Sequence, residues 1–199
     1  MNSFFASVEQ QENPSWRGRP VAVTALTNQT GCIVAASVEA KALGVKNVSQ
    51  VSEVKRICPQ IILTPSRHRL YVRYNQRIAA VLDSLAELER VRSVDEFQVA
   101  LGGDTAHLGS AIALTKRLKQ AVRKQVGSQL QFSAGIGPNQ LLAKIAGKLE
   151  KPNGLQWLSP ENMPDALAHL ALDDLPGISH GTKARLFQAG IKTILQLLS

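Results

Sequence analysis

The sequence is poor in cysteine and in acidic residues, and it contains no long run of apolar residues. Its two cysteines, Cys32 and Cys58, each stand alone in apolar surroundings, which is typical of thiols in a reducing compartment. The sequence contains no C-x-x-C motif and no Cys/His cluster, so it has no motif for binding zinc. Because the sequence shows neither a membrane-spanning run nor a signal peptide, we expect a cytoplasmic protein with no membrane partner.

The shortage of acidic residues makes the chain basic. Lysine and arginine outnumber aspartate and glutamate by 23 to 15, which gives a net charge of +8 and an isoelectric point near 9.8. This excess favours a polyanionic partner, nucleic acid first, although an unspecialised basic surface has the same composition. The chain has 199 residues, of which 44% are hydrophobic, so we expect one domain with a hydrophobic core and one small additional unit.

Hydrophobic periodicity predicts alternating strands and helices up to about Trp157, and short helices after Pro160. The predicted helices cover residues 4–9, 37–41, 51–57, 71–88, 107–126 and 138–149. The predicted strands cover residues 21–24, 32–36, 61–63, 91–101 and 131–136. This order indicates an α/β or α+β domain followed by a separate, small helical unit.

The most informative motif is the pair of adjacent carboxylates Asp95 and Glu96, which follows a strand-like run. Two carboxylates at a strand end can bind Mg²⁺ through hard oxygen ligands and leave room for phosphate oxygens and water. A two-metal site for phosphoryl transfer normally needs a further carboxylate from another strand. An isolated Asp-Glu pair is also common at a solvated hairpin corner, so the pair alone leaves both interpretations open.

A second motif, residues 175–186, resembles a helix-hairpin-helix. A Pro-Gly turn and the N-terminus of the following helix can direct backbone N–H groups at a phosphate. The residues in these positions are Gly177, Ile178, Gly181, Thr182 and Lys183. The alternative is an ordinary helix-turn-helix packing element, and Ser179 stands where such hairpins usually have a second glycine.

Three further segments are ambiguous when each is taken alone. The glycines of residues 133–146 match neither the P-loop nor the G-x-G-x-x-G pattern, so this segment reads as a strand-turn-helix core element. Lys151 precedes a Pro-Asn-Gly turn, where it could reach a triphosphate or lie in a surface loop. The paired aromatics Phe4 and Phe5 are typical of a core, but one of them could wall a pocket beside a sugar.

Taken together and in order, these segments resemble the Y-family, or translesion, DNA polymerases over nearly the whole chain. The segments that carry the resemblance are 2–9, 35–45, 93–96, 133–146, 151–154 and 175–178. The resemblance implies template-directed DNA synthesis past damaged bases, with two Mg²⁺ ions flanking the reaction. Its implied partners are primer-template DNA and a dNTP, and a sliding clamp would bind through a region beyond Ser199.

The resemblance also implies an α+β fold. Residues 1–158 would form a ferredoxin-like polymerase palm with small fingers at about 14–66, and residues 159–199 would form an all-α thumb containing the helix-hairpin-helix. The C-terminal DNA-gripping domain of the family is absent from the sequence, so the resemblance implies a fragment.

By the same resemblance, the nucleotide meets residues from three segments. Phe5 matches the aromatic steric gate that stacks under the deoxyribose and excludes a 2′-hydroxyl. Ser3 and Phe4 match the backbone that cradles the triphosphate, and Lys41 and Lys151 match positions that contact it. Lys41 replaces the common arginine and gives up its bidentate phosphate contacts.

The resemblance assigns catalysis and metal binding to Asp95 and Glu96, with the backbone of Met1 as a further metal ligand. The family's first catalytic aspartate, on a central strand of the palm sheet, would lie one residue before Met1. We therefore expect the chain as it stands to hold the two metal ions poorly. Two alternatives stay open: a catalytically inactive Y-family relative acting as a DNA-binding repair module, and an unrelated α/β nucleotide-binding domain.

Overall fold

The computed structural model describes residues 1–25 and 31–198, so a short part of the range predicted for the fingers, and Ser199, lie outside the described residues. The chain forms two compact units, residues 1–132 and 133–199. The palm-to-thumb boundary expected at residue 158 stays a prediction. In the described part of the chain, no helix has both the length and the apolar character needed to cross a membrane.

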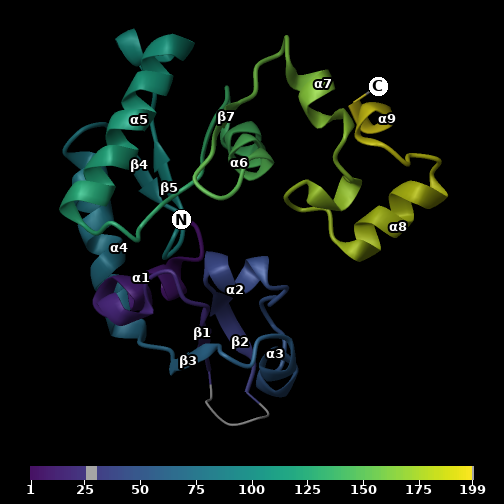
Figure 1. Cartoon of the computed structure of the whole chain (residues 1–199). Helices are drawn as coiled ribbons and strands as arrows, with labels where there is room; N and C mark the ends of the chain where they lie inside the picture. Colours follow the sequence, from purple (N-terminus) through teal and green to yellow (C-terminus); the bar gives the residue numbers. More distant parts are fainter. Residues whose placement is uncertain (26–30, 199) are drawn as a thin grey trace. The chain divides into compact units, whose positions relative to one another are not determined.

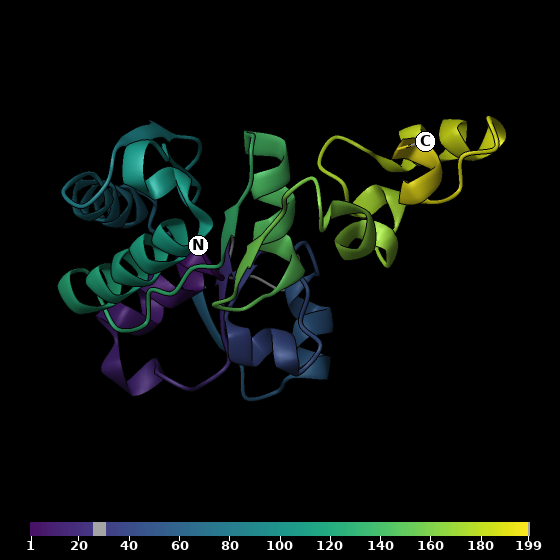
Figure 2. The same cartoon turned by 90° about the horizontal axis from the view of Figure 1, so that it is seen from above.

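The core of the first unit lies among three helices, α1 (Phe4–Glu12), α4 (His68–Asp83) and α5 (Leu108–Gln125). The two long helices are amphipathic, and α4 packs against α5 (Figures 1 and 2). Arg77 on α4 donates to the backbone carbonyl of Val126, just beyond α5, at 3.3 Å. The buried residues that the helices contribute include Phe4, Val8, Leu70, Tyr71, Tyr74, Ile78, Leu114, Leu118 and Val122.

The first unit also contains a three-stranded sheet with strand order β2-β1-β3. The central strand β1 (Val21–Thr24) pairs antiparallel with β2 (Ile33–Ala36) and parallel with β3 (Ile62–Pro65). All four residues of β1 are buried, as expected for a central strand covered on both faces. The short 3₁₀ helix η1 (Pro14–Trp16) lies between α1 and this sheet in the chain.

Helices α2 (Val38–Ala42) and α3 (Val51–Ile57) lie next to this sheet (Figure 1). Together with the sheet they form a second hydrophobic cluster, separate from the first. Its buried members are Ala22, Ile33, Ala36, Ala40, Val45, Val51, Val54 and Cys58. All of them fall within the range 14–66 predicted for the fingers.

A β-hairpin follows α4, and it corrects two predicted boundaries. Strands β4 (Leu88–Val91) and β5 (Phe97–Val99) pair antiparallel, so the single strand predicted over 91–101 is wrong. The helix predicted to reach Leu88 ends at Asp83, because Leu88 pairs with a strand that lies farther along the chain. Leucine and alanine continue the helical period at 85 and 86, so local pattern could not reveal this ending. A 3₁₀ helix, η2 (Gly103–Ala106), leads into α5.

The second unit opens with a strand-helix-strand element. β6 (Ala134–Ile136) pairs parallel with β7 (Leu155–Trp157), and α6 (Gln140–Leu149) connects them (Figure 2). The strand-turn-helix expected for residues 133–146 is therefore confirmed, whereas β7 was not predicted. Gly135 lets the helix approach the strand, because a Cβ there would lie 1.9 Å from the carbonyl oxygen of Ala143.

After β7 the second unit contains only helices in the part of the chain that the structure describes. They are α7 (Met163–Ala168), the 3₁₀ helix η3 (Leu172–Asp174), α8 (His180–Gln188) and α9 (Ile194–Leu198). They share a third hydrophobic cluster with α6, whose buried members are Ile145, Ala146, Leu158, Leu167, Leu172 and Ile194. The small helical unit expected after Pro160 thus has a core in common with α6.

The mixed α/β architecture agrees with the predicted fold class, but one ferredoxin-like sheet is not formed among the described strands. β4 and β5 form one two-stranded sheet, and β6 and β7 form another. The first pair belongs to the first unit and the second pair to the second unit.

Candidate active site

The candidate site starts at the N-terminus of α1. Ser3 occupies the N-cap position of this helix without a side-chain capping bond, and its φ of 46° and ψ of 42° are a left-handed conformation that serine seldom adopts. The first backbone N–H groups of a helix have no partner within it, and they lie at the positive end of its dipole. Because the Phe4 side chain is buried in the core, only its backbone is placed to meet a ligand. This geometry fits an anion at the start of α1.

Phe5, the next residue, is half-buried and lies against α4. Its ring stacks on that of Tyr71, with 4.3 Å between the centroids and 14° between the planes. The ring of Phe4 is tilted away by 50° at 5.8 Å. The two adjacent phenylalanines therefore differ: Phe4 fills the core, and Phe5 lies at its edge.

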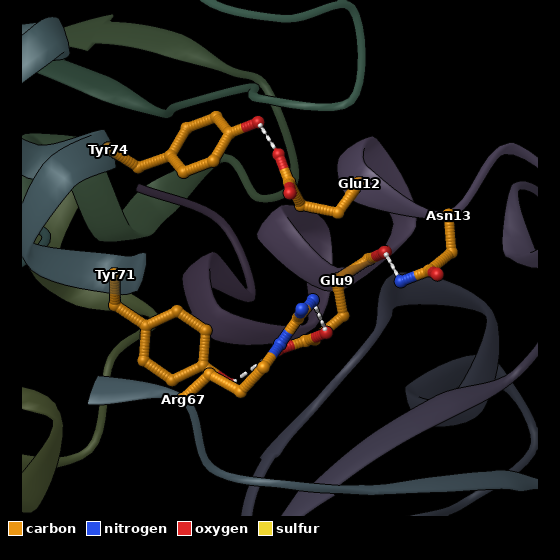
Figure 3. A network of polar contacts seen from close by, with 6 residues as sticks. All are labelled: Glu9, Glu12, Asn13, Arg67, Tyr71 and Tyr74. Carbon is orange, nitrogen blue, oxygen red and sulfur yellow. Dashed lines mark hydrogen bonds and ion pairs between the residues drawn. The ribbon is translucent and has the colours of Figure 1, made fainter. Parts of the chain in front are cut away.

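A polar network joins α1 to the start of α4 (Figure 3), and it includes Tyr71, on whose ring Phe5 stacks. The Tyr71 hydroxyl donates to Glu9 Oε1 at 2.7 Å, and Arg67 Nε donates to the same oxygen at 3.0 Å. Arg67 also forms an ion pair through Nη2 with Glu9 Oε2. The hydrogen bond with Glu9 raises the pKa of Arg67, and burial raises the pKa of Tyr71. Glu9 is fully buried, so these partners replace its solvation.

A similar contact lies one turn farther along both helices. The Tyr74 hydroxyl donates to Glu12 Oε1 at 2.7 Å (Figure 3). Burial, followed by this hydrogen bond, raises the pKa of Tyr74 to about 12. The guanidinium carbon of Arg77 lies 5.2 Å from the centre of the Tyr74 ring.

Asp95 and Glu96 lie in the turn between β4 and β5. The Ser93 hydroxyl donates to Asp95 Oδ1 at 2.9 Å, and the Met1 ammonium donates to the backbone carbonyl of Asp95 at 2.5 Å. Asn75 on α4 donates to the nearby backbone carbonyl of Val94 at 2.9 Å. The acidic turn is thus fixed both to α4 and to the residues just before α1.

The structure therefore brings the Met1 ammonium and the Asp95 backbone carbonyl together, and the shared metal-binding role of the two residues stays a prediction. Asp95 is half-buried and Glu96 is exposed. Carboxylate and carbonyl oxygens are the donors that Mg²⁺ prefers, so the chemistry of this set fits that ion. Among residues 1–25 and 31–198, however, no three His, Cys, Asp or Glu side chains gather into a group that could hold a metal ion.

Lys41 lies on an element that is tied to α1. It is exposed in the last turn of α2, and Ser37 caps this helix by accepting from the backbone N–H of Ala40. Gln10 on α1 donates to Glu39 Oε2 on α2 at 3.0 Å. Phe5, Asp95 and Lys41 are thus predicted site residues on connected elements of one compact unit.

The other predicted site residues belong to the second unit. Lys151 is exposed in the turn between α6 and β7. Gly177 has φ 94°, and Ser179 caps α8 by accepting from the backbone N–H of Thr182. Lys183 forms an ion pair with Asp173 at 2.7 Å, and this contact lowers the pKa of Asp173.

The turn at Gly177 is followed by a regular helix, but only the three residues of η3 form a helix immediately before it. Ile178 packs against the third hydrophobic cluster and anchors the turn to the unit's core. The helix-hairpin-helix thus stays a prediction.

Four residues that support Phe5 and the acidic turn were not identified from the sequence: Glu9, Arg67, Tyr71 and Asn75. One signal was available, since Glu9 lies one helical turn after Phe5 on a helix whose neighbouring residues are buried. Its partner Arg67 is 58 positions away, so the pairing has no local signature.

The model of the impB/mucB/samB family matches residues 1–148. The chain is 38% identical over 198 residues to DNA polymerase IV of Moorella thermoacetica, covering 98% of this chain and 49% of that protein. It is 31% identical over 193 residues to DNA polymerase IV of Shewanella oneidensis, covering 97% of this chain and 54% of that protein. The chain thus spans about half the length of the curated relatives it matches.

Solved structures are similar over almost the whole chain. The insertion ternary complex of Dbh DNA polymerase matches with a TM-score of 0.88 and 31% identity, covering 99% of this chain and 58% of that one. DinB from Sulfolobus solfataricus matches with a TM-score of 0.85 and 31% identity, covering 99% and 57%. These comparisons confirm the resemblance to the Y-family DNA polymerases that the ordered motifs predicted.

Proposed function

Because the chain belongs to the impB/mucB/samB family, we propose that the protein carries out template-directed DNA synthesis past damaged bases, as part of DNA repair. The observation that carries this proposal is the hydrogen bond from Met1 to the carbonyl of Asp95. It places the acidic turn next to the start of α1, where Phe5 lies. A carboxylate, a helix N-terminus and a half-buried aromatic ring are thereby gathered in one region.

The nucleotide would be held mainly by the first unit. The backbone at Ser3 and Phe4 binds the triphosphate at the positive end of α1. Lys41 and Lys151 add positive charge as flexible point charges, without the paired geometry of arginine. Phe5 lies under the deoxyribose and leaves no space for a 2′-hydroxyl.

Asp95, Glu96 and the Met1 backbone carbonyl would hold the two Mg²⁺ ions expected for this reaction. When bound, Mg²⁺ neutralises negative charge on the phosphates and favours ionisation of the attacking hydroxyl. The chain itself positions these groups, since Ser93 and Asn75 fix the turn that carries both carboxylates. Positioning and electrostatics supply most of the rate in such a reaction.

Primer-template DNA would be bound by the helical part of the second unit, the proposed thumb at 159–199. The residues proposed to contact the DNA backbone are Gly177, Ile178, Gly181, Thr182 and Lys183. Lys183 would exchange Asp173 for a phosphate, which replaces one charge-assisted contact by another. The same proposal includes a palm with fingers at residues 1–158, a sliding clamp as a partner, and a cytoplasmic location.

A second candidate function, a DNA-binding repair module without polymerase activity, is favoured by the donor set. In the part of the chain that the structure describes, no third His, Cys, Asp or Glu joins Asp95 and Glu96 in a metal-binding group.

Primer extension in Mg²⁺ distinguishes the two functions. The assay uses a chain extended at its N-terminus by a strand that carries the family's catalytic aspartate. In this extended chain, Asp95→Ala is compared with Asp104→Ala, which removes an exposed aspartate in η2. We expect Asp95→Ala to lower extension by about a thousandfold or more, and Asp104→Ala to leave it unchanged. Extension that survives Asp95→Ala would overturn the assignment of Asp95. Salt-sensitive DNA binding without any extension would favour the repair module.

A further inference from the structure

The proposed function leaves one buried structure unexplained, the ion pair of Glu9 and Arg67 behind Phe5. Glu9 is fully buried on α1, and a buried carboxylate is costly unless charged or polar partners surround it. Arg67 and Tyr71 provide these partners (Figure 3). A simple core contact would not need this arrangement.

Tyr71 links the ion pair to Phe5. Its hydroxyl is fixed on Glu9 at 2.7 Å, and one face of its ring lies against the Phe5 ring at 4.3 Å between centroids. The Tyr71 side chain is completely buried, so it has no space in which to swing away. Any shift of its hydroxyl therefore moves the surface on which Phe5 rests.

We propose that Glu9 and Arg67 are positioning residues for sugar selection: they fix Tyr71, and Tyr71 holds the Phe5 ring in one orientation. This inference rests on the proposed function, in which Phe5 meets the sugar. A gate that rejects a single hydroxyl group depends on the exact place of one ring edge. Small displacements at such a site change rates and affinities strongly.

Arg67 is the best place to perturb this arrangement. It lies at the junction where β3 has ended and α4 begins, and 43% of its side chain is exposed. Replacing it removes the charge that orients Glu9 without opening a large cavity in the core. Tyr71→Phe is the complementary change, because it keeps the stacked ring and removes only the bond to Glu9.

The chain offers a matched control in Tyr74. Its hydroxyl donates to Glu12 at the same distance, 2.7 Å, as that of Tyr71 to Glu9, and it is also buried on α4. Its ring lies near Arg77. Tyr74→Phe thus removes a hydrogen bond of the same length, to the exposed Glu12, outside the stacked pair.

The experiment has two readouts on the chain and its Arg67→Gln, Arg67→Lys, Tyr71→Phe and Tyr74→Phe variants. The first is the ¹⁹F resonance of Phe5 in protein labelled with 4-fluorophenylalanine, assigned through Phe5→Leu. The second is the ratio of the dissociation constants of ATP and dATP in Mg²⁺. The first readout needs no nucleotide, so it tests the positioning separately from the proposed function.

We expect Arg67→Gln and Tyr71→Phe to shift or broaden the Phe5 resonance. Both changes should also lower the dissociation constant of ATP relative to that of dATP by about 5- to 10-fold. Arg67→Lys should recover part of both effects, and Tyr74→Phe should change neither. An unchanged Phe5 resonance in folded Arg67→Gln and Tyr71→Phe would overturn the positioning role. A moved resonance with an unchanged ratio would overturn the link to sugar selection. If the unaltered chain binds neither nucleotide, the proposed function fails for this chain, and the resonance still decides the positioning.

Discussion

The ring of Phe5 lies almost parallel to the ring of Tyr71, with 4.3 Å between their centroids. Tyr71 is fully buried and Phe5 half-buried, so the stack covers one face of Phe5 while part of its ring stays accessible. Offset or parallel aromatic pairs of this kind are worth about 0.5–1.5 kcal/mol beyond burial. The Phe5 ring is therefore held in one orientation by an aromatic neighbour in the core.

If the Phe5 ring selects the sugar, Phe5→Ala should admit ribonucleotides. Removing the ring opens space for a 2′-hydroxyl while the buried Tyr71 stays in place. We expect the preference for dNTP over rNTP to fall by about a hundredfold or more in primer extension by the N-terminally extended chain. Unchanged discrimination would place the gate elsewhere. Phe4→Ala is no substitute, because Phe4 is only 4% exposed and its loss should cost about 3–5 kcal/mol of stability.

Stability should fall in alkaline solution because of Tyr71 and Tyr74. An unfolded tyrosine has a pKa near 10, whereas burial raises the pKa of both residues in the folded protein, that of Tyr74 to about 12. Their contribution to stability is complete below about pH 10. It is then lost as the pH rises, because the unfolded chain releases these protons first. We expect a loss of about 1.4 kcal/mol per tyrosine per pH unit between about pH 10 and 12.

The measurement is unusually direct, because the chain contains only two tyrosines. Tyrosinate absorbance of the folded chain should appear only well above pH 10, and that of the urea-unfolded chain near pH 10. The double variant Tyr71→Phe/Tyr74→Phe should show no such loss of unfolding free energy between about pH 10 and 12. Folded and unfolded chains with the same titration midpoint would contradict the prediction.

The sequence predicted most elements of the fold because their signals are local. Helix α5 was expected over 107–126 and is found over 108–125, since its apolar period and its boundaries are written in adjacent residues. The end of α4 was missed, because Leu88 leaves the helical pattern only by pairing with Val99. The sequence similarly placed Asp95 and Phe5 in motifs, but it did not reveal that Met1 and Tyr71 hold them, because those contacts cross 94 and 66 positions of the chain.

Gly135 should tolerate no side chain. A Cβ there would lie 1.9 Å from the carbonyl oxygen of Ala143 and 2.2 Å from the backbone nitrogen of Gly147, and neither atom can move without shifting α6. We expect Gly135→Ala to lower the free energy of unfolding by about 3 kcal/mol or more, measured by urea denaturation. The control is Gly109→Ala in α5, where a Cβ meets no atom within 4 Å, and it should be neutral or stabilise by up to about 1 kcal/mol. Equal effects of the two changes would mean that the close approach of α6 to β6 is not needed for stability.

Lys183 should contribute one phosphate contact to DNA binding. It lies in the first turn of α8 and pairs with Asp173 at 2.7 Å, so DNA binding would have to replace that carboxylate by a phosphate. We expect Lys183→Gln to weaken binding of primer-template DNA, measured by fluorescence anisotropy across a range of salt concentrations. The slope of log affinity against log salt should become shallower by about 0.9, the value for one neutralised phosphate.

The matched control for Lys183 is Lys192→Gln, which removes the same charge from an exposed position after α8 in the same unit. Long-range attraction from the basic surface depends on net charge, so both variants should lose a similar, small part of it. A specific contact at the turn adds a loss that only Lys183→Gln shows. If both variants changed the salt slope equally, DNA would be attracted by the overall charge of the unit, and the residues from Gly177 to Lys183 would be an ordinary packing element of its core.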